Sequence, residues 1–379
     1  MRILHCGPFK IGTANGSYNA LWSLAKAQAR LGHDVTIIRI GKSVHPDQSR
    51  IAEQANVRLV GFPCHRWWNF WKDSSGIFAS YVEEFKPDIA HLQYVRVPKY
   101  FYISRYLREK KTPYVVSLHG GMNSTEMRRN HWRKMVYWHL VEKKVHQGAA
   151  ALHFVTKEEM SDYYRTFRIN HEHDASIFNT VEPPENIPHW QQKISSGRIS
   201  FAYFGRYDIW HKGIDLVFEL LRILQNNFGI KAEFHLYGSP GNRFVETFSQ
   251  LCAQYPDIEI SDHGFVDGIK KFQSMVGYDF YIQYSRFELF GISMVEAMQC
   301  GVPILVSENC DLAKHILEKD AAIVLSMEPG QSATVLNTLL ANPRVIAERA
   351  ARGKAWAITT FSADKIAEEM FQFYERVVE

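Results

Sequence analysis

Cysteine is scarce in this sequence, which has five cysteines scattered among 379 residues. Their number is odd and no Cys-x-x-Cys pair occurs, so neither a disulfide framework nor a zinc site is indicated. Asp-x-Asp tripeptides are also missing, so no metal-chelating carboxylate pair is evident. We therefore expect no metal or other cofactor, and a reducing, cytoplasmic location.

Long apolar runs are missing as well. No apolar run is long enough to span a bilayer, and the apolar stretch at the N-terminus is too short for a signal peptide. The formal net charge is +4, which by itself indicates neither nucleic acid nor membrane, and we expect no nucleic-acid partner. With 46% hydrophobic and 22% charged residues, the chain is globular and long enough for two domains.

Strand and helix patterns alternate through the first half at the spacing of βαβ units, which predicts a parallel sheet covered on both faces. The polar, Pro-bearing stretch 182–197 then interrupts the pattern, and a second α/β series starts at Arg198. We predict two doubly wound, Rossmann-like domains at 1–185 and 186–361. Such domains bind ligands at the carboxyl ends of their strands.

The most informative stretch of the sequence is 286–303, where Glu288 and Glu296 are separated by seven residues. Ile292–Cys300 is predicted to be a helix, because its apolar residues recur every three positions and Gly301 and Pro303 supply stop signals. Glu296 then lies in the second turn, close to the packed face. A carboxylate there needs a partner, and a bound ligand is one candidate; a solvated helix position is the alternative.

A second motif combines Gly205-Arg206 with Lys212-Gly213, just after the predicted strand 199–204. Two cations on a strand-end loop suit a diphosphate, because arginine offers a planar fork and lysine a point charge. Backbone N–H groups of Phe290, Gly291 and Ile292, at the start of the predicted helix 292–300, would add donors for the same anion. Solvated surface cations are the alternative interpretation.

Together these strings resemble the signatures of retaining GT-B glycosyltransferases, especially glycosyltransferase family 4. The agreement includes Glu-x-Phe-Gly, Glu-Ala-Met, Gly-x-Pro and the Gly-Arg and Lys-Gly-x-Asp pieces, and the resemblance covers nearly the whole chain. It implies that Glu288 contacts the donor sugar, that Glu296 binds the ribose hydroxyls, and that Arg206 and Lys212 hold the phosphates. It also implies that the last helix, 362–379, packs back on the first domain.

The resemblance extends to four further segments. His119, in His119-Gly120-Gly121, matches a segment near the transferred sugar, and Gly16 matches the glycine-rich loop after the first strand. Gly238 and Phe265 match loops around the nucleobase. Gly205, beside Arg206, completes the donor-binding set. A structural histidine and ordinary glycine turns are the alternatives.

The resemblance thus implies a metal-independent, retaining transfer of a hexose-type sugar from a nucleotide-diphosphate donor to a glycan or lipid-linked acceptor. Two other classes stay open: a GT-B epimerase or phosphorylase, and a non-catalytic nucleotide-sugar-binding scaffold.

Basic and aromatic residues are interleaved between Met122 and Gln147, and aromatic residues cluster at Trp67–Trp71. The first region is either a solvated helix face or a peripheral contact with the inner face of a membrane. The second is core, a sugar platform or a membrane contact.

Overall fold

The computed structural model describes residues 1–13, 15–63, 71–128, 130–191, 198–239 and 244–379. Its contacts divide the chain into two compact units. The first unit comprises Met1–Ile11, Ser17–Thr180 and Ala363–Glu379. The second comprises Gly12–Gly16 and Val181–Ser362.

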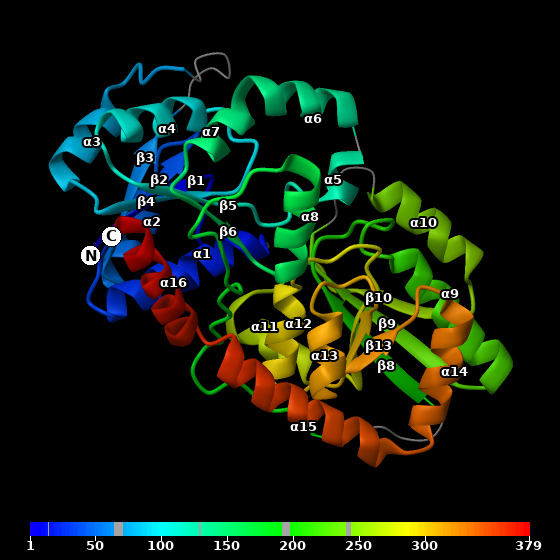
Figure 1. Ribbon diagram of the computed structural model, residues 1–379. Helices are drawn as coiled ribbons and strands as arrows, with labels where there is room; N and C mark the ends of the chain where they lie inside the picture. The colour runs from blue at the N-terminus through cyan, green and yellow to red at the C-terminus, as the bar shows by residue number, and fades with distance from the viewer. Residues whose placement is uncertain (14, 64–70, 129, 192–197, 240–243) are drawn as a thin grey trace. The chain divides into compact units, whose positions relative to one another are not determined.

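The first unit is a parallel sheet with helices on both faces (Figure 1). In the described residues the strand order is β3-β2-β1-β4-β5-β6-β7. The strands are β1 (Arg2–Gly7), β2 (Asp34–Ile40), β3 (Val57–Phe62), β4 (Ile89–Gln93), β5 (Tyr114–Ser117), β6 (Ala151–Phe154) and β7 (Ala175–Ser176). The helices are α1 (Gly16–Arg30), α2 (Pro46–Gln54), α3 (Ile77–Phe85), α4 (Tyr100–Glu109), α5 (Ser124–Arg128), α6 (His131–Tyr137), the π-helical turn η2 (Trp138–Glu142), α7 (Lys143–Gln147), α8 (Lys157–Phe167) and α16 (Ala363–Val378).

Successive strand residues of this sheet enter opposite cores, because side chains alternate between the two faces. On β5, Val115 joins the cluster under α1 and α16, whereas Tyr114 and Val116 join the cluster under α3, α4, α7 and α8. The C-terminal helix α16 contributes six buried residues to the first of these clusters. The last helix is therefore an integral layer of the first unit.

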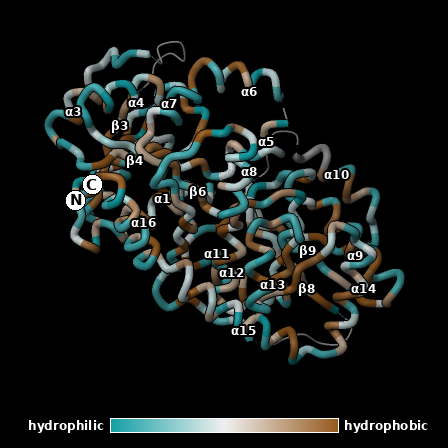
Figure 2. The backbone as a smooth tube through the Cα atoms, viewed as in Figure 1, coloured by the Kyte–Doolittle hydropathy of each residue, from teal (hydrophilic) through white to brown (hydrophobic). Residues whose placement is uncertain are grey.

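The second unit repeats the architecture around a sheet of order β10-β9-β8-β11-β12-β13 in the described residues. Figure 2 shows hydrophobic stretches near the labels β8 and β9, two strands that supply core residues of this unit. The strands are β8 (Arg198–Phe204), β9 (Lys231–Tyr237), β10 (Glu259–Asp262), β11 (Phe280–Gln283), β12 (Ile304–Ser307) and β13 (Ile323–Leu325). The helices are α9 (Ile214–Phe228), α10 (Phe244–Gln254), α11 (Gly268–Met275), α12 (Ile292–Gln299), α13 (Ala313–Lys319), α14 (Pro329–Leu340) and α15 (Pro343–Thr360).

Each sheet has one topological switch point, between β1 and β4 in the first unit and between β8 and β11 in the second. Neighbouring connections leave in opposite directions there, which opens a crevice at the carboxyl ends of the two strands. The predicted fold class, two doubly wound Rossmann-like sheets, is confirmed.

The helical segment 131–147 is interrupted by the π-helical turn η2, in which the Lys143 N–H donates to the Trp138 carbonyl. The last strand of the first sheet, β7, has only two residues. Of the Trp67–Trp71 cluster, all but Trp71 lies outside the described residues, and Trp71 is 44% exposed.

Candidate active site

The second unit gathers three glycine-bearing loops at the carboxyl ends of β8, β9 and β10. The Gly205 N–H donates to the Tyr237 carbonyl at 2.9 Å, and the Gly238 N–H donates to the Gly264 carbonyl at 2.8 Å. A Cβ on Gly238 would lie 1.8 Å from the Gly205 carbonyl oxygen, which no side chain can tolerate. Glycine is thus required for the loops to approach this closely.

Arg206 follows directly at the end of β8. Its side chain is 62% exposed, and its nearest carboxylate oxygen, on Asp208, lies 4.0 Å away. An exposed guanidinium held this loosely at a switch point remains available to an incoming anion.

Lys212 and Glu288 form the centre of the site. Lys212 Nζ donates to Glu288 Oε2 at 2.6 Å, and both side chains are largely buried. Gln283 Nε2 donates to the same oxygen at 2.5 Å. Burial disfavours the charged carboxylate, but the Lys212 ammonium and these hydrogen bonds hold the pKa of Glu288 below its ordinary value.

Gly213 places Lys212 at this point. It caps α9 in the left-handed conformation with φ of 62°, and a Cβ there would lie 2.0 Å from the Tyr284 carbonyl oxygen. Arg286 holds the same loop with two hydrogen bonds to Asp215, at 2.8 and 2.7 Å. This Arg286–Asp215 pair was not anticipated from the sequence, although both residues lie inside the two motifs. Its role is to position the loop.

Glu296 lies on α12 beside a partner that the sequence analysis did not identify. Lys271, on α11, forms an ion pair with the Glu296 carboxylate and also donates to Ser293 Oγ at 3.2 Å. Both charged side chains are mostly buried. The predicted need of Glu296 for a partner is thus met by the protein itself. Lys271 lies four positions after Asp267 in no recognisable motif, so the sequence gave no signal for this pairing.

The start of α12 supplies backbone donors. Gly291 caps the helix with φ of 75°, and the next N–H groups have no intrahelical acceptor. The Phe290 side chain is buried and packs edge-on against Phe361 at 5.2 Å, so only its backbone is placed for a ligand. Together with Lys212 and Arg206, these N–H groups form an anion-binding edge.

Phe265 and Gly16 complete the predicted donor set. Phe265 is 46% exposed and follows Gly264 at the end of β10. Gly16 groups with the second unit, where a Cβ on it would lie 3.2 Å from Ile292 Cδ1. Both are therefore in the same unit as Glu288 and Glu296.

His119 belongs to the first unit and follows β5. Its backbone is left-handed with φ of 47°, and its Nε2 lies 2.9 Å from Gln93 Oε1 at the end of β4. Burial lowers the pKa of His119 to about 3, so the ring is neutral near pH 7. It lies at the carboxyl edge of its own sheet.

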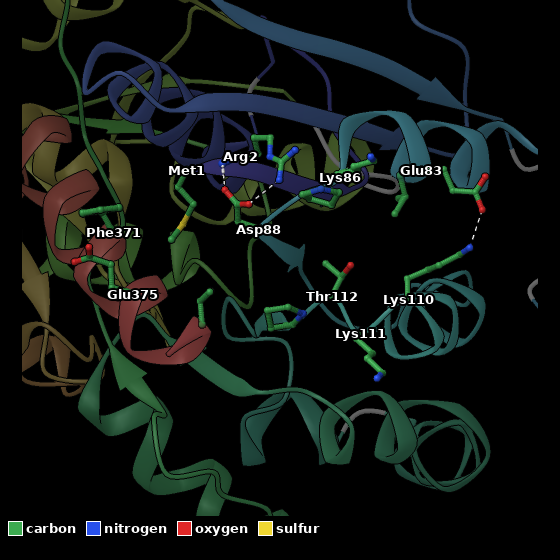
Figure 3. Close-up of a pocket in the computed structure, with 14 residues that line it drawn as sticks. Met1, Arg2, Glu83, Lys86, Asp88, Lys110, Lys111, Thr112, Phe371 and Glu375 are labelled. Carbon is green, nitrogen blue, oxygen red and sulfur yellow. Dashed lines mark hydrogen bonds and ion pairs between the residues drawn. The ribbon is translucent and has the colours of Figure 1, made fainter.

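A surface cavity of about 760 Å³ lies elsewhere on the first unit (Figure 3). Arg2, Asp88, Lys110 and Lys111 line it, at the ends where β1, β4 and β5 begin. Two of the lining ion pairs are Arg2–Asp88 and Glu83–Lys110. Because α/β sheets bind ligands at the opposite edge, we do not place the site here.

Among the described residues, none of the helices has the length and apolar character that a membrane span requires. No three His, Cys, Asp or Glu side chains in this described part of the chain come together as a metal-binding group.

Comparison with known families assigns both halves of the chain. Residues 15–173 match the Glycosyl transferase 4-like domain, and residues 185–356 match Glycosyl transferases group 1. The chain is a GT-B glycosyltransferase of family 4. As a member of this family, it is expected to draw its sugar from a nucleotide-sugar donor.

Known structures share the fold at low identity. HepE of Anabaena, solved with UDP and glucose, superposes with a TM-score of 0.76 at 16% identity, over 99% of this chain and all of that one. Sucrose-phosphate synthase of Thermosynechococcus elongatus gives 0.72 at 16%, over 100% and 99%. Glycogen synthase 2 of Agrobacterium fabrum is 28% identical over 122 residues, which is 32% of this chain and only 23% of that relative.

Proposed function

We propose that this family 4 glycosyltransferase moves a hexose-type sugar, with retention and without a metal ion, from a nucleotide-diphosphate donor to a glycan or lipid-linked acceptor. The observation that carries the proposal is the anion-binding edge of the second unit. Loosely paired Arg206, Lys212 beside Glu288, and the free N–H groups of α12 converge at the β8/β11 switch point. The second unit would thus hold the donor and the first unit the acceptor.

In this mechanism the diphosphate is the leaving group. Arg206 and Lys212 stabilise the negative charge that develops on it, which is the largest contribution expected in such chemistry. When the diphosphate arrives, Lys212 gains a second anionic partner and Glu288 is free to accept hydrogen bonds from sugar hydroxyls. Glu296 would hold the ribose diol while its carboxylate stays paired with Lys271. Among the residues that the structure describes, no side chain presents itself as a covalent nucleophile, so we propose departure and attack on the same face.

Thermal-shift screening with UDP-, GDP-, ADP- and dTDP-sugars tests the donor, since a ligand that binds only the folded state raises its stability. UDP-glucose is the first candidate, because HepE has been solved with it. Glu296→Ala should weaken binding of the free nucleotide in calorimetry. Equal affinity would refute the ribose assignment, and a product formed from donor alone would indicate an epimerase.

Metal independence has its own test. Turnover should be unchanged after EDTA treatment and after Mg²⁺ or Mn²⁺ addition, because Arg206 and Lys212 would already neutralise the diphosphate. An activity that EDTA abolishes and Mg²⁺ restores would contradict this part of the proposal.

We further propose a peripheral membrane contact through the exposed face of α6 and η2, consistent with a lipid-linked acceptor at the inner face of a membrane. Trp132, Val136 and Leu140 stand four residues apart and are 67, 51 and 66% exposed. Exposed Arg128, Arg133 and Lys144 accompany them. In contrast, Glu142 is buried, where it accepts hydrogen bonds from the Arg96 N–H, and Glu126 pairs with Lys134. An apolar stripe flanked by cations suits an anionic bilayer.

Vesicle flotation tests this contact. The protein should float with vesicles containing anionic phospholipid, less in high salt, and not with phosphatidylcholine alone. Trp132→Ser with Leu140→Ser should abolish flotation. Leu317→Ser removes a comparably exposed leucine from the second unit and is the control. Equal flotation of the double variant would contradict the contact.

A further inference from the structure

A chain of buried polar side chains runs through the first unit from its interior to His119. Strands β1, β4, β5 and β6 each contribute members, and α1 and α16 add one each. All of them except His119 are at most 3% exposed, and they lie between two clusters of buried, mainly apolar residues. The members are His5, Gln28, His91, Gln93, Ser117, His119, His153 and Tyr374.

The direction of the hydrogen bonds is fixed at the far end of the chain. His153 Nε2 lies 2.9 Å from the Ile177 carbonyl oxygen, which can only accept, so this nitrogen carries the ring proton. His153 Nδ1 must then accept from the Ser117 hydroxyl at 2.5 Å. Ser117 Oγ in turn accepts from His91 Nε2, and His91 Nδ1 accepts from the Tyr374 hydroxyl, both at 2.5 Å.

The second half of the chain has the same direction. His5 Nε2 donates to Gln28 Oε1 at 2.8 Å, and Gln93 Nε2 donates to His5 Nδ1 at 3.1 Å. Gln93 Oε1 is then left to accept from His119 Nε2 at 2.9 Å. The halves meet at Gln28, whose side chain opposes the effect of burial on the pKa of the Tyr374 hydroxyl. Its Nε2 is buried and has no hydrogen-bond partner in the described residues.

All four histidines of this hydrogen-bond network are neutral near pH 7. Burial lowers the pKa of His5 and of His153 to about 4 and that of His119 to about 3, and it holds the pKa of His91 well below its ordinary value. A neutral imidazole has one donor nitrogen and one acceptor nitrogen. Each ring that donates through one nitrogen must therefore accept through the other, so the hydrogen bonds keep one direction along the network.

The chain ends at an unused acceptor. His119 Nδ1 is buried and has no hydrogen-bond partner in the described residues. His119 also lines a cavity of about 20 Å³, together with His91, Gln93 and Asn179. A buried acceptor without a donor is costly, so a ligand that supplies a donor would be favoured.

We propose that Gln93 is a positioning residue: it holds His119 in the Nε2-protonated form, so that Nδ1 accepts a hydrogen bond from one hydroxyl of the transferred sugar. The sugar half of this inference rests on the proposed function. His119 then recognises a free hydroxyl and takes no part in proton transfer. A donor that lacks this hydroxyl, or carries an ether in its place, leaves Nδ1 unpaired and should be disfavoured.

The tautomer is testable without any substrate. Long-range ¹H–¹⁵N spectra of the full-length, ligand-free protein should show a protonated Nε2 and an unprotonated Nδ1 for His119, assigned by loss of the signal in His119→Gln. Gln93→Met should give a mixture of tautomers, whereas Gln93→Glu, whose carboxylate can only accept, should keep the Nε2-protonated form. A protonated Nδ1 in the unaltered protein would overturn the inference.

Kinetics with UDP-glucose and its four monodeoxy analogues test the sugar half. One analogue should lose about tenfold in kcat/KM, the value of one hydrogen bond to a buried acceptor. This tenfold difference in kcat/KM between UDP-glucose and that analogue should disappear in Gln93→Met and be present in Gln93→Glu. Ser104→Ala, a buried polar substitution in the same unit, is the control and should keep it.

Three further results decide the matter. If Gln93→Met discriminates between UDP-glucose and the analogues as strongly as the unaltered protein does, the sugar half is wrong even where transfer is normal. If Gln93→Met merely lowers the melting temperature and scales all donors equally, Gln93 is structural and the proposal fails. If no nucleotide-sugar is turned over at all, the proposed function fails with the sugar half, while the spectra still decide the tautomer.

Discussion

Lys212 has two competing tasks at the scale of single residues. It neutralises Glu288 in the ligand-free protein and, in the proposed mechanism, stabilises the departing diphosphate. Lys212→Ala and Arg206→Ala should each lower kcat about 10²-fold, because a fixed cation acts most strongly on charge that develops in the transition state. Steady-state rates check this. Arg222→Ala removes an exposed cation on α9 and should leave kcat unchanged; unchanged rates in both site variants would contradict the role.

The same pair gives a prediction about pH. The pKa of Glu288 is depressed, so its contribution to stability is present above the unfolded value of about 4.3 and is lost as pH falls through the lower folded value. In Lys212→Met, burial is the largest single effect on this carboxyl and raises its pKa, opposed only by the charge of His211 and the hydrogen bond from Gln283. We therefore expect the sign of the pKa shift to reverse. That variant should lose stability as pH rises from 5 to 7. Melting curves at the two pH values measure the difference, and an unaltered pH profile would refute the coupling.

Sequence motifs located the predicted site residues but not all their partners. Glu288, Lys212 and Arg206 stand in strings whose spacing places them on strand-end loops. Lys271 could not be anticipated, because its pairing with Glu296 depends on how α11 packs beside α12. Gln93 was equally hidden, since a lone glutamine in a strand carries no motif and its contact with His119 joins neighbouring strands.

At the scale of elements, hydrophobic periodicity predicts long strands and helices well and local irregularities poorly. The π-helical turn within 131–147 requires one extra residue per turn, and it coincides with burial of Trp138 against Phe167 and of Glu142 beside Arg96. These are tertiary contacts, so the sequence pattern of one helix does not contain them.

The helix α16 provides an element-scale prediction. Phe373 is fully buried in the cluster that α16 shares with β1, β4, β5 and β6. Phe373→Ala should destabilise the first unit by about 3–5 kcal/mol, through lost transfer free energy and a cavity. Gln372→Ala, at the exposed neighbouring position, should have little effect. Denaturant unfolding compares the two, and equal midpoints would show that α16 is not part of the core.

At the scale of the whole molecule, each unit has a hydrophobic core of its own. Unfolding should therefore proceed in more than one step, because two-state behaviour holds mainly for single domains. UDP at 100 times its Kd should raise the free energy of unfolding of the second unit by about 2.7 kcal/mol. Calorimetry with and without UDP measures this. A single transition that shifts as a whole would mean that the units unfold together.

The path of the chain also bears on its synthesis. The first unit is built from both ends of the sequence, whereas the second is almost continuous from Val181 to Ser362. A ribosome therefore releases every strand of the second sheet before it releases α16, whose buried side chains complete the first. The first unit should therefore complete its folding after the second, and the nascent first sheet should be prone to aggregation until α16 has been synthesised.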